Sequence, residues 1–174
     1  MSHRYVCIAL VLLAAPAYAD APPAAPTGLG RLAAILPGIW KTSGETYATQ
    51  FTQAGKVNYV TVRDCWHEGT EFKCVFVVNN KLQLFGIYSW DSPNGIYHEN
   101  QITVQGPSPV FNIYVKGDTW TYLQDGEDKE GKIYHTRLTK TYGSSTSVAI
   151  TSEYSLDGKT WVLYEKATET RVAE

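Results

Sequence analysis

The chain has 174 residues, of which 44% are hydrophobic and 13% aromatic, and its formal net charge is −2. A weakly acidic chain without basic blocks lacks the electrostatic character of nucleic-acid-binding proteins, so we expect no nucleic-acid partner. This length corresponds to one domain, and it is sufficient to bury about two-thirds of the unfolded surface without cross-links.

The N-terminal residues 1–19 have the pattern of a secretory signal peptide. Arg4 precedes the apolar run of residues 6–15, which is too short to cross a bilayer as a helix. Ala17 and Ala19 then supply the small residues of a cleavage site. We therefore expect a periplasmic or secreted protein that keeps no membrane anchor after signal cleavage.

Two short segments precede the body of the protein. Residues 20–27 are rich in proline and alanine, which predicts a flexible tether. Residues 28–36 carry leucine and isoleucine at helical spacing, and Pro37 and Gly38 end that pattern. We expect one short helix here, at the start of a single domain over residues 28–170.

From Ile39 onward the hydrophobic pattern has a period of two, which predicts β-strands. Aromatic and β-branched residues dominate residues 59–62, 75–78, 84–90 and 111–115. Five residue pairs favour two-residue hairpin turns; they are Gly69-Thr70, Asn79-Asn80, Asn94-Gly95, Gly117-Asp118 and Asp157-Gly158.

These short connections determine the fold class. No segment between the predicted strands is long enough for a crossover helix, so every strand pairs antiparallel with a neighbour. A long meander leaves two exposed edges unless it closes on itself. We therefore predict an all-β, up-and-down antiparallel β-barrel of about ten strands.

The two mature cysteines are placed to form a disulfide across one hairpin. With Gly69-Thr70 as the turn, Cys65 faces Cys74 in a pair without backbone hydrogen bonds, whose Cα atoms lie about 4.5 Å apart. This distance suits a disulfide, and an exported protein meets an oxidising compartment. A bridge over so short a loop contributes about 2–3 kcal/mol. No helix N-terminus is at hand to activate a thiol, so we expect a structural disulfide rather than a redox site.

The sequence Gly38-Ile39-Trp40, directly after the predicted helix, resembles the Gly-x-Trp signature of lipocalins and related calycin barrels. The wider pattern resembles a bacterial exported, lipocalin-like family of uncharacterised function. The resemblance implies a short helix that closes one end of the barrel. It also implies a basic residue from the last strand against the tryptophan, for which Lys166 and Arg171 are the candidates.

The last predicted hairpin pairs two aromatic residues. With Asp157-Gly158 as a type I′ turn, Tyr154 lies opposite Trp161, a cross-strand pair that contributes up to about 1 kcal/mol. We interpret this segment as structural.

Four polar and aromatic residues of the central hairpin share one strand face. With Asn94-Gly95 as the turn, Trp90 faces Glu99 and Tyr88 faces Gln101. Alternation leaves open whether this face or the opposite one points into the barrel. Arg63 lies on the same face as the disulfide. The candidate ligand-binding residues are Arg63, Tyr88, Trp90, Glu99 and Gln101.

The histidines His67, His98 and His135 have no partner at metal-ligand spacing, so we expect no metal and no cofactor. We predict a barrel that binds a small amphipathic or aromatic molecule in its lumen. Two alternatives stay open: an acid–base enzyme that works in the lumen, which we favour less, and a filled barrel that serves as a structural or protein-interaction module. The sequence does not determine the oligomeric state.

Overall fold

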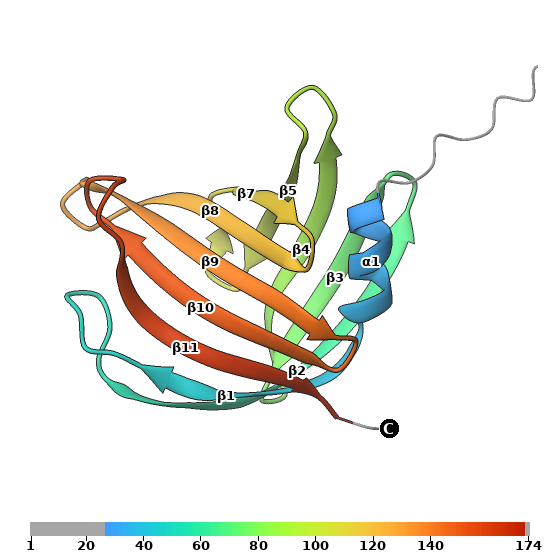
Figure 1. Cartoon of the computed structure of the whole chain (residues 1–174), viewed down its shortest axis with the longest axis horizontal. Coiled ribbons are helices and arrows are strands. Elements are labelled where there is room, and N and C mark those ends of the chain that lie inside the picture. The colour runs from blue at the N-terminus through green and yellow to red at the C-terminus, as the bar shows by residue number, and fades with distance from the viewer. Residues whose placement is uncertain (1–26, 173–174) are drawn as a thin grey trace, which may run out of the picture.

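The computed structural model describes residues 27–172, so the predicted signal peptide and nearly all of the predicted tether lie outside the described residues. One sheet with the strand order β4-β3-β2-β1-β11-β10-β9-β8-β7-β5-β6 forms the body of the protein, and a β4–β5 pairing closes it. Ten antiparallel strands thus form a closed barrel, and β6 is a short addition to β5. The predicted fold class is confirmed (Figure 1).

The helix and the strands have the following bounds: α1 Thr27–Ile35, β1 Gly38–Thr46, β2 Gly55–Glu68, β3 Glu71–Val78, β4 Lys81–Asp91, β5 Ile96–Thr103, β6 Gly106–Pro107, β7 Phe111–Lys116, β8 Thr119–Glu127, β9 Ile133–Ser144, β10 Ser147–Ser155 and β11 Val162–Arg171. Within residues 27–172, no helix is long and apolar enough to cross a membrane.

Three of the predicted two-residue turns are present. Glu68 pairs with Glu71 around Gly69-Thr70, and Lys116 pairs with Thr119 around Gly117-Asp118. Asn79 and Asn80 both have positive φ, 48° and 63°, as a type I′ turn requires. These turns set the register of the strands on either side of them.

The predicted two-residue turn at Asn94-Gly95 is wrong, because the loop begins two residues earlier in the chain. Asp91 pairs with Ile96, so the loop has four residues, and the side chain of Asp91 accepts a hydrogen bond from the Asn94 amide nitrogen at 3.3 Å. As a result Tyr88 faces Glu99, two residues away from the predicted register. Because a shift of two preserves the strand face, the predicted grouping of side chains survives.

The predicted pairing of Tyr154 with Trp161 is also wrong, since Tyr154 pairs with Val162. The carboxylate of Asp157 accepts hydrogen bonds from the amide nitrogens of Lys159 and Thr160 at 2.8 and 2.7 Å, which holds a longer loop in place. An aspartate that bonds to the backbone beyond it favours such a wider turn over a tight hairpin.

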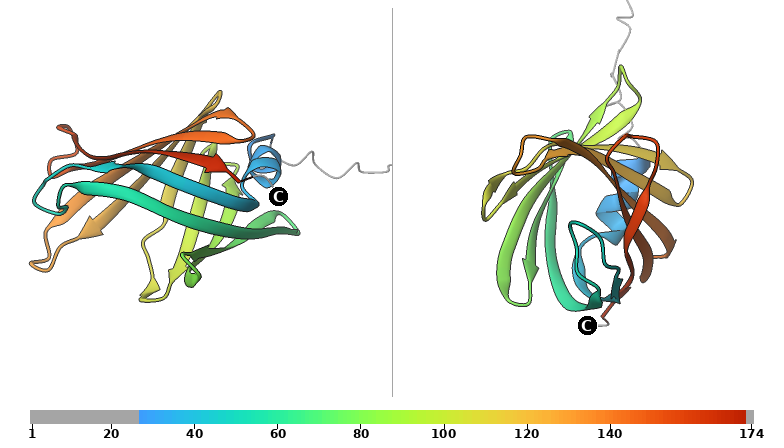
Figure 2. Two further views of the ribbon diagram at one scale, coloured as in Figure 1. Left: turned by 90° about the horizontal axis from the view of Figure 1, so that it is seen from below. Right: turned by 90° about the vertical axis from the view of Figure 1, so that its left-hand side faces the viewer.

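The helix α1 closes one end of the barrel, as the family resemblance implied (Figure 2, right). Trp40 is fully buried beneath it, and its indole nitrogen donates to the Leu36 carbonyl at 2.9 Å. The guanidinium of Arg171 lies 5.1 Å from the Trp40 ring centroid and also donates to the Ile35 carbonyl at 3.0 Å. Arg171 therefore occupies the position of the basic residue, whereas Lys166 is exposed.

The disulfide between Cys65 and Cys74 is present in the predicted register, with the Cα atoms 4.1 Å apart. The pair faces the barrel interior, and Cys74 is fully buried in the core. The bridge therefore fixes the β2–β3 hairpin against the closed end. Arg63 faces Phe76 in the same register, as expected.

Candidate functional site

The half of the barrel away from α1 is hollow. A cavity of about 440 Å³ opens there, lined by residues of β2–β5 and of β7, β9 and β11. Its lining combines apolar and charged side chains, and consists of Tyr59, Thr61, Arg63, Phe76, Val78, Gln83, Leu84, Tyr88, Glu99, Gln101, Phe111, Leu138, Lys140 and Glu169. A volume of this size suits one small molecule.

A buried ion pair at the cavity joins β2 and β11, the two strands on either side of β1. Arg63 on β2 donates through Nη2 to Oε1 of Glu169 on β11, and both side chains are at most 5% exposed. The guanidinium of Arg63 also lies 5.2 Å from the ring centroid of Trp40, the residue beneath the helix. The pair thus marks the boundary between the filled and the hollow halves of the barrel.

This ion pair leaves hydrogen-bonding capacity unused. The atoms Nε and Nη1 of Arg63 and Oε2 of Glu169 are buried and have no hydrogen-bond partner. Burial raises the pKa of Glu169, whereas the nearby positive charges of Lys140 and Arg63 lower it. The lowering is larger, so the pKa of Glu169 lies below its ordinary value. The site therefore holds an ionised carboxylate and a guanidinium with free donors and a free acceptor.

Lys140 on β9 enters the cavity from the other side. Its Nζ lies 5.3 Å from the Tyr122 ring centroid, and no carboxylate among residues 27–172 is within ion-pair distance of it. Burial lowers the pKa of Lys140. An ammonium group without a direct acidic partner can bind an oxygen acceptor of a ligand.

A third polar group gathers around Glu99 on β5. Its Oε1 accepts hydrogen bonds from the Tyr88 hydroxyl and from Nε2 of Gln101, each at 2.9 Å. Burial raises the pKa of Tyr88 well above its ordinary value, so its hydroxyl keeps the proton that it donates. A side chain at Gly86 would place a Cβ only 3.3 Å from the same oxygen, so the glycine leaves room for the carboxylate.

The cavity continues toward the mouth of the barrel. An adjoining cavity of about 310 Å³ shares Lys140 and Glu169 with the first and also reaches Glu165 and Ser152. Burial raises the pKa of Glu165, whose Oε2 accepts a hydrogen bond from the Ser152 hydroxyl at 3.2 Å. The apolar surface shared by both cavities comes from Phe111 and Leu138.

Four of the five predicted ligand-binding residues line the main cavity: Arg63, Tyr88, Glu99 and Gln101. Trp90 does not line it; it is 38% exposed near the end of β4, and its ring packs on Tyr97 with the centroids 4.5 Å apart. The roles of these residues in binding stay predictions.

The sequence analysis missed the side of the cavity formed by β9 and β11. Lys140 and Glu169 lie in strands where inward and outward residues are equally polar, so alternation gives no orientation. From Glu165 to Thr170, for example, one strand face carries two glutamates and an alanine, and the other carries Lys166 and two threonines. The orientation of Glu169 follows only from the pairing of β11 with β1, in which Glu169 faces Thr42.

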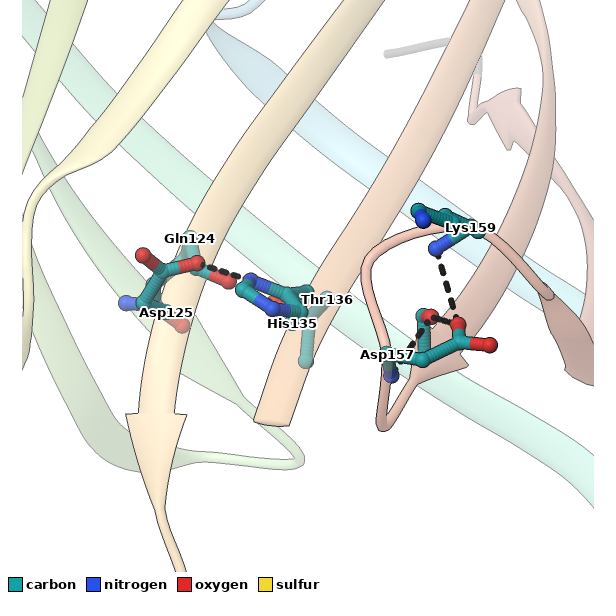
Figure 3. Close-up of polar contacts among 7 residues, drawn as sticks. Gln124, Asp125, His135, Thr136, Asp157 and Lys159 are labelled. Atoms are coloured by element: carbon teal, nitrogen blue, oxygen red, sulfur yellow. Dashed lines mark hydrogen bonds and ion pairs between the residues drawn. The ribbon is translucent and has the colours of Figure 1, made fainter. Parts of the chain in front are cut away.

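A second polar cluster lies on the outside of the barrel, at the ends of β8, β9 and β10 (Figure 3). Nδ1 of His135 contacts Oδ1 of Asp125 at 2.6 Å, and Asp157 lies nearby in the β10–β11 loop. The hydroxyl of Ser155 on β10 donates to Asp157 at 2.9 Å and helps to hold the loop in place. Among the described residues, no group of three histidine, cysteine or carboxylate side chains could hold a metal ion.

Comparison with known proteins supports the fold. No protein-family model matches the chain, and no curated protein matches it. The crystal structure of Rv2717c from M. tuberculosis is similar, with a TM-score of 0.52 over 88% of this chain and 100% of that chain, at 13% sequence identity. This likeness concerns the architecture of the barrel alone.

Proposed function

We propose that this protein binds a small amphipathic or aromatic molecule in the hollow half of its barrel. One observation carries the proposal: the buried pair Arg63–Glu169 at the floor of an open cavity retains polar atoms without partners. Unpaired buried polar atoms cost stability. A protein whose lumen served only to fill the barrel would gain by replacing them with apolar side chains.

The chemistry of the lining indicates how such a molecule would lie. Its apolar part would contact Phe111 and Leu138, and its polar end would reach Arg63, Lys140 and Glu169. Because the floor offers both donors and acceptors, the polar end needs both as well, or bridging water. A mostly apolar pocket with a few convergent polar groups is the usual form of a small-molecule site.

A binding titration with 1-anilinonaphthalene-8-sulfonate, a small aromatic anion that fluoresces in apolar surroundings, tests the proposal. Leu138 and Thr139 are neighbours on β9, and only Leu138 lines the cavity. Leu138→Trp fills the lumen and should weaken binding of the dye by about tenfold or more, equivalent to a loss of at least about 1.4 kcal/mol. Thr139→Trp adds the same ring outside the barrel and should leave binding unchanged.

Two results would contradict the proposal. The first is equal binding of the dye to both variants, which would locate its site outside the lumen. The second comes from the chain purified from its own host. Native mass spectrometry would detect no co-purifying small molecule, and a panel of metabolites would give no thermal stabilisation. The lumen would then have no natural ligand.

A further inference from the structure

The outer faces of the two barrel walls have different chemistry. On the wall formed by β8–β11, the outward side chains are mainly threonines and charged residues; Thr121, Thr139 and Thr151, for example, follow one another across β8, β9 and β10. On the wall formed by β1–β5, the middle of the outward face carries mainly valine, isoleucine, leucine and aromatic residues, and polar side chains surround them. We call this second surface the apolar wall.

Strand register places the residues of the apolar wall in rows. The first row crosses β1 to β4 and contains Ile39, Val62, Val77 and Leu82, each of which faces the next across a strand pair. The second row crosses β2 to β5 and contains Asp64, Val75, Phe85 and Ile102. Trp66 begins the next row, and its ring lies 5.9 Å from that of Phe85.

Several of these side chains are open to solvent in the single chain, whereas Val75, Val77 and Phe85 are half-buried. Val62 is 39% exposed, Trp66 40%, Ile102 54% and Leu82 57%. Each row crosses four strands spaced about 4.8 Å apart, so the patch is roughly 15 to 20 Å wide. The largest apolar patch of a monomer usually measures about 300–600 Å² and is often functional. A standard interface takes about 800 Å² from each partner and has a polar rim, so the polar side chains around this patch must contribute to any contact.

No helix or strand of residues 27–172 covers this wall, because α1 lies across one end of the barrel (Figure 1). The charges on it identify the occupant. Lys73 is already bonded to Glu68 at 2.8 Å and to Glu71 at 3.2 Å. Asp64 and Lys41 are exposed, and neither has an ion-pair partner within the described part of the chain. The wall thus presents one free anion and one free cation, and it has no excess of basic residues for an anionic lipid surface.

We propose that a second copy of this chain packs on the apolar wall, about a two-fold axis that runs along the row of Ile39, Val62, Val77 and Leu82. A two-fold interface brings the same surface of both copies together, so the surface must complement itself. An axis that touches the convex wall at the middle of this row brings Val62 and Val77 onto their counterparts. It also exchanges the flanking rows, so that the row of Asp64 in one protomer opposes the row of Lys41 and Val60 in its partner.

The register gives the expected geometry of this contact. Lys41 pairs with Val60 across β1 and β2, and Asp64 lies four residues further along β2. The two rows are therefore equally distant from the axis. Asp64 and Lys41 lie on adjacent strands, about 4.8 Å apart laterally, which a lysine side chain spans.

Sedimentation velocity of the purified full chain over a wide range of concentration tests the proposal. We expect a dimer, with Val62→Lys weakening association by about tenfold or more because it places a cation on the axis opposite itself. Thr168→Lys is the matched control, since it adds the same charge to an exposed β-branched position on the outside of β11. This control should leave the dimer intact.

A charge exchange separates a specific interface from a folding defect. Asp64→Lys and Lys41→Asp should each weaken the dimer, and the double variant should restore it, because the opposing charges are then exchanged. Circular dichroism checks that each variant is folded. A chain that stays monomeric at every concentration, a dimer insensitive to Val62→Lys, a double variant that does not recover, or a monomer that instead floats with lipid vesicles would each overturn the proposal.

Discussion

The two ends of the barrel are built from the same strands but differ in how their interior is filled. At the closed end α1 covers a dense apolar core, in which Trp40 and Trp120 are fully buried. In the open half, the side chains of Arg63, Glu169 and Lys140 on these strands line a cavity of about 440 Å³. The closed end thus carries a continuous apolar core, whereas the open half leaves charged side chains around a cavity.

The largest expected effect belongs to the closed end. Trp40→Ala should destabilise the protein by about 4 kcal/mol, because it removes a fully buried ring and leaves a void under the helix. Leu138→Ala in the cavity wall should cost only about 1 kcal/mol, since it enlarges an existing space. Urea unfolding of both variants measures the difference. Similar losses from the two substitutions would show that the two halves contribute equally.

The next effect concerns the ion pair between the two halves. Glu169→Gln leaves the buried Arg63 without a carboxylate and should cost about 3 kcal/mol at neutral pH. Glu153→Gln is the control, because its pair with Arg137 at 2.7 Å lies on the outer surface. The side chains of Arg137 and Glu153 are 31% and 22% exposed, against 3% and 5% for Arg63 and Glu169, so this pair should contribute only about 1 kcal/mol.

The same ion pair has a defined pH dependence. The pKa of Glu169 in the folded protein is lowered, on balance, by Lys140 and Arg63 against the opposing effect of burial. Its contribution is therefore present above the unfolded pKa, about 4.3, and is lost as the pH falls through the folded pKa. Unfolding measured from neutral to acidic pH should show the gap between wild type and Glu169→Gln closing. A constant gap would contradict this account.

The smallest effect has the opposite sign. Burial lowers the pKa of Lys140, so the charged amine destabilises the empty barrel at neutral pH. Lys140→Met keeps the apolar stem and should stabilise the protein by about 1 kcal/mol. Since this cost disappears as the pH rises toward the unfolded pKa of about 10.4, the advantage should vanish there. Destabilisation by Lys140→Met at neutral pH would show that the ammonium supports the fold.

Local signals were sufficient where a turn and its strands depend on adjacent residues. The pairing of Cys65 with Cys74 follows from the turn at Gly69-Thr70 and alternation alone, and the structure confirms it. The prediction for the loop around Asn94 was wrong, because the side chain of Asp91 accepts a hydrogen bond from the backbone of Asn94 and widens the turn. An Asn-Gly pair favours a tight turn, but a neighbouring carboxylate competes for the same backbone groups.

The sequence by itself determined the class of the fold, the cysteine hairpin and the strand face that carries Tyr88, Glu99 and Gln101, since these depend on period, turn chemistry and short-range register. Only the tertiary structure decided which face points inward and which distant residues meet. Arg63 and Glu169 are 106 positions apart in the chain, and barrel closure brings them together. Nothing local to either residue encodes that contact, because it depends on how all ten barrel strands are ordered around the axis.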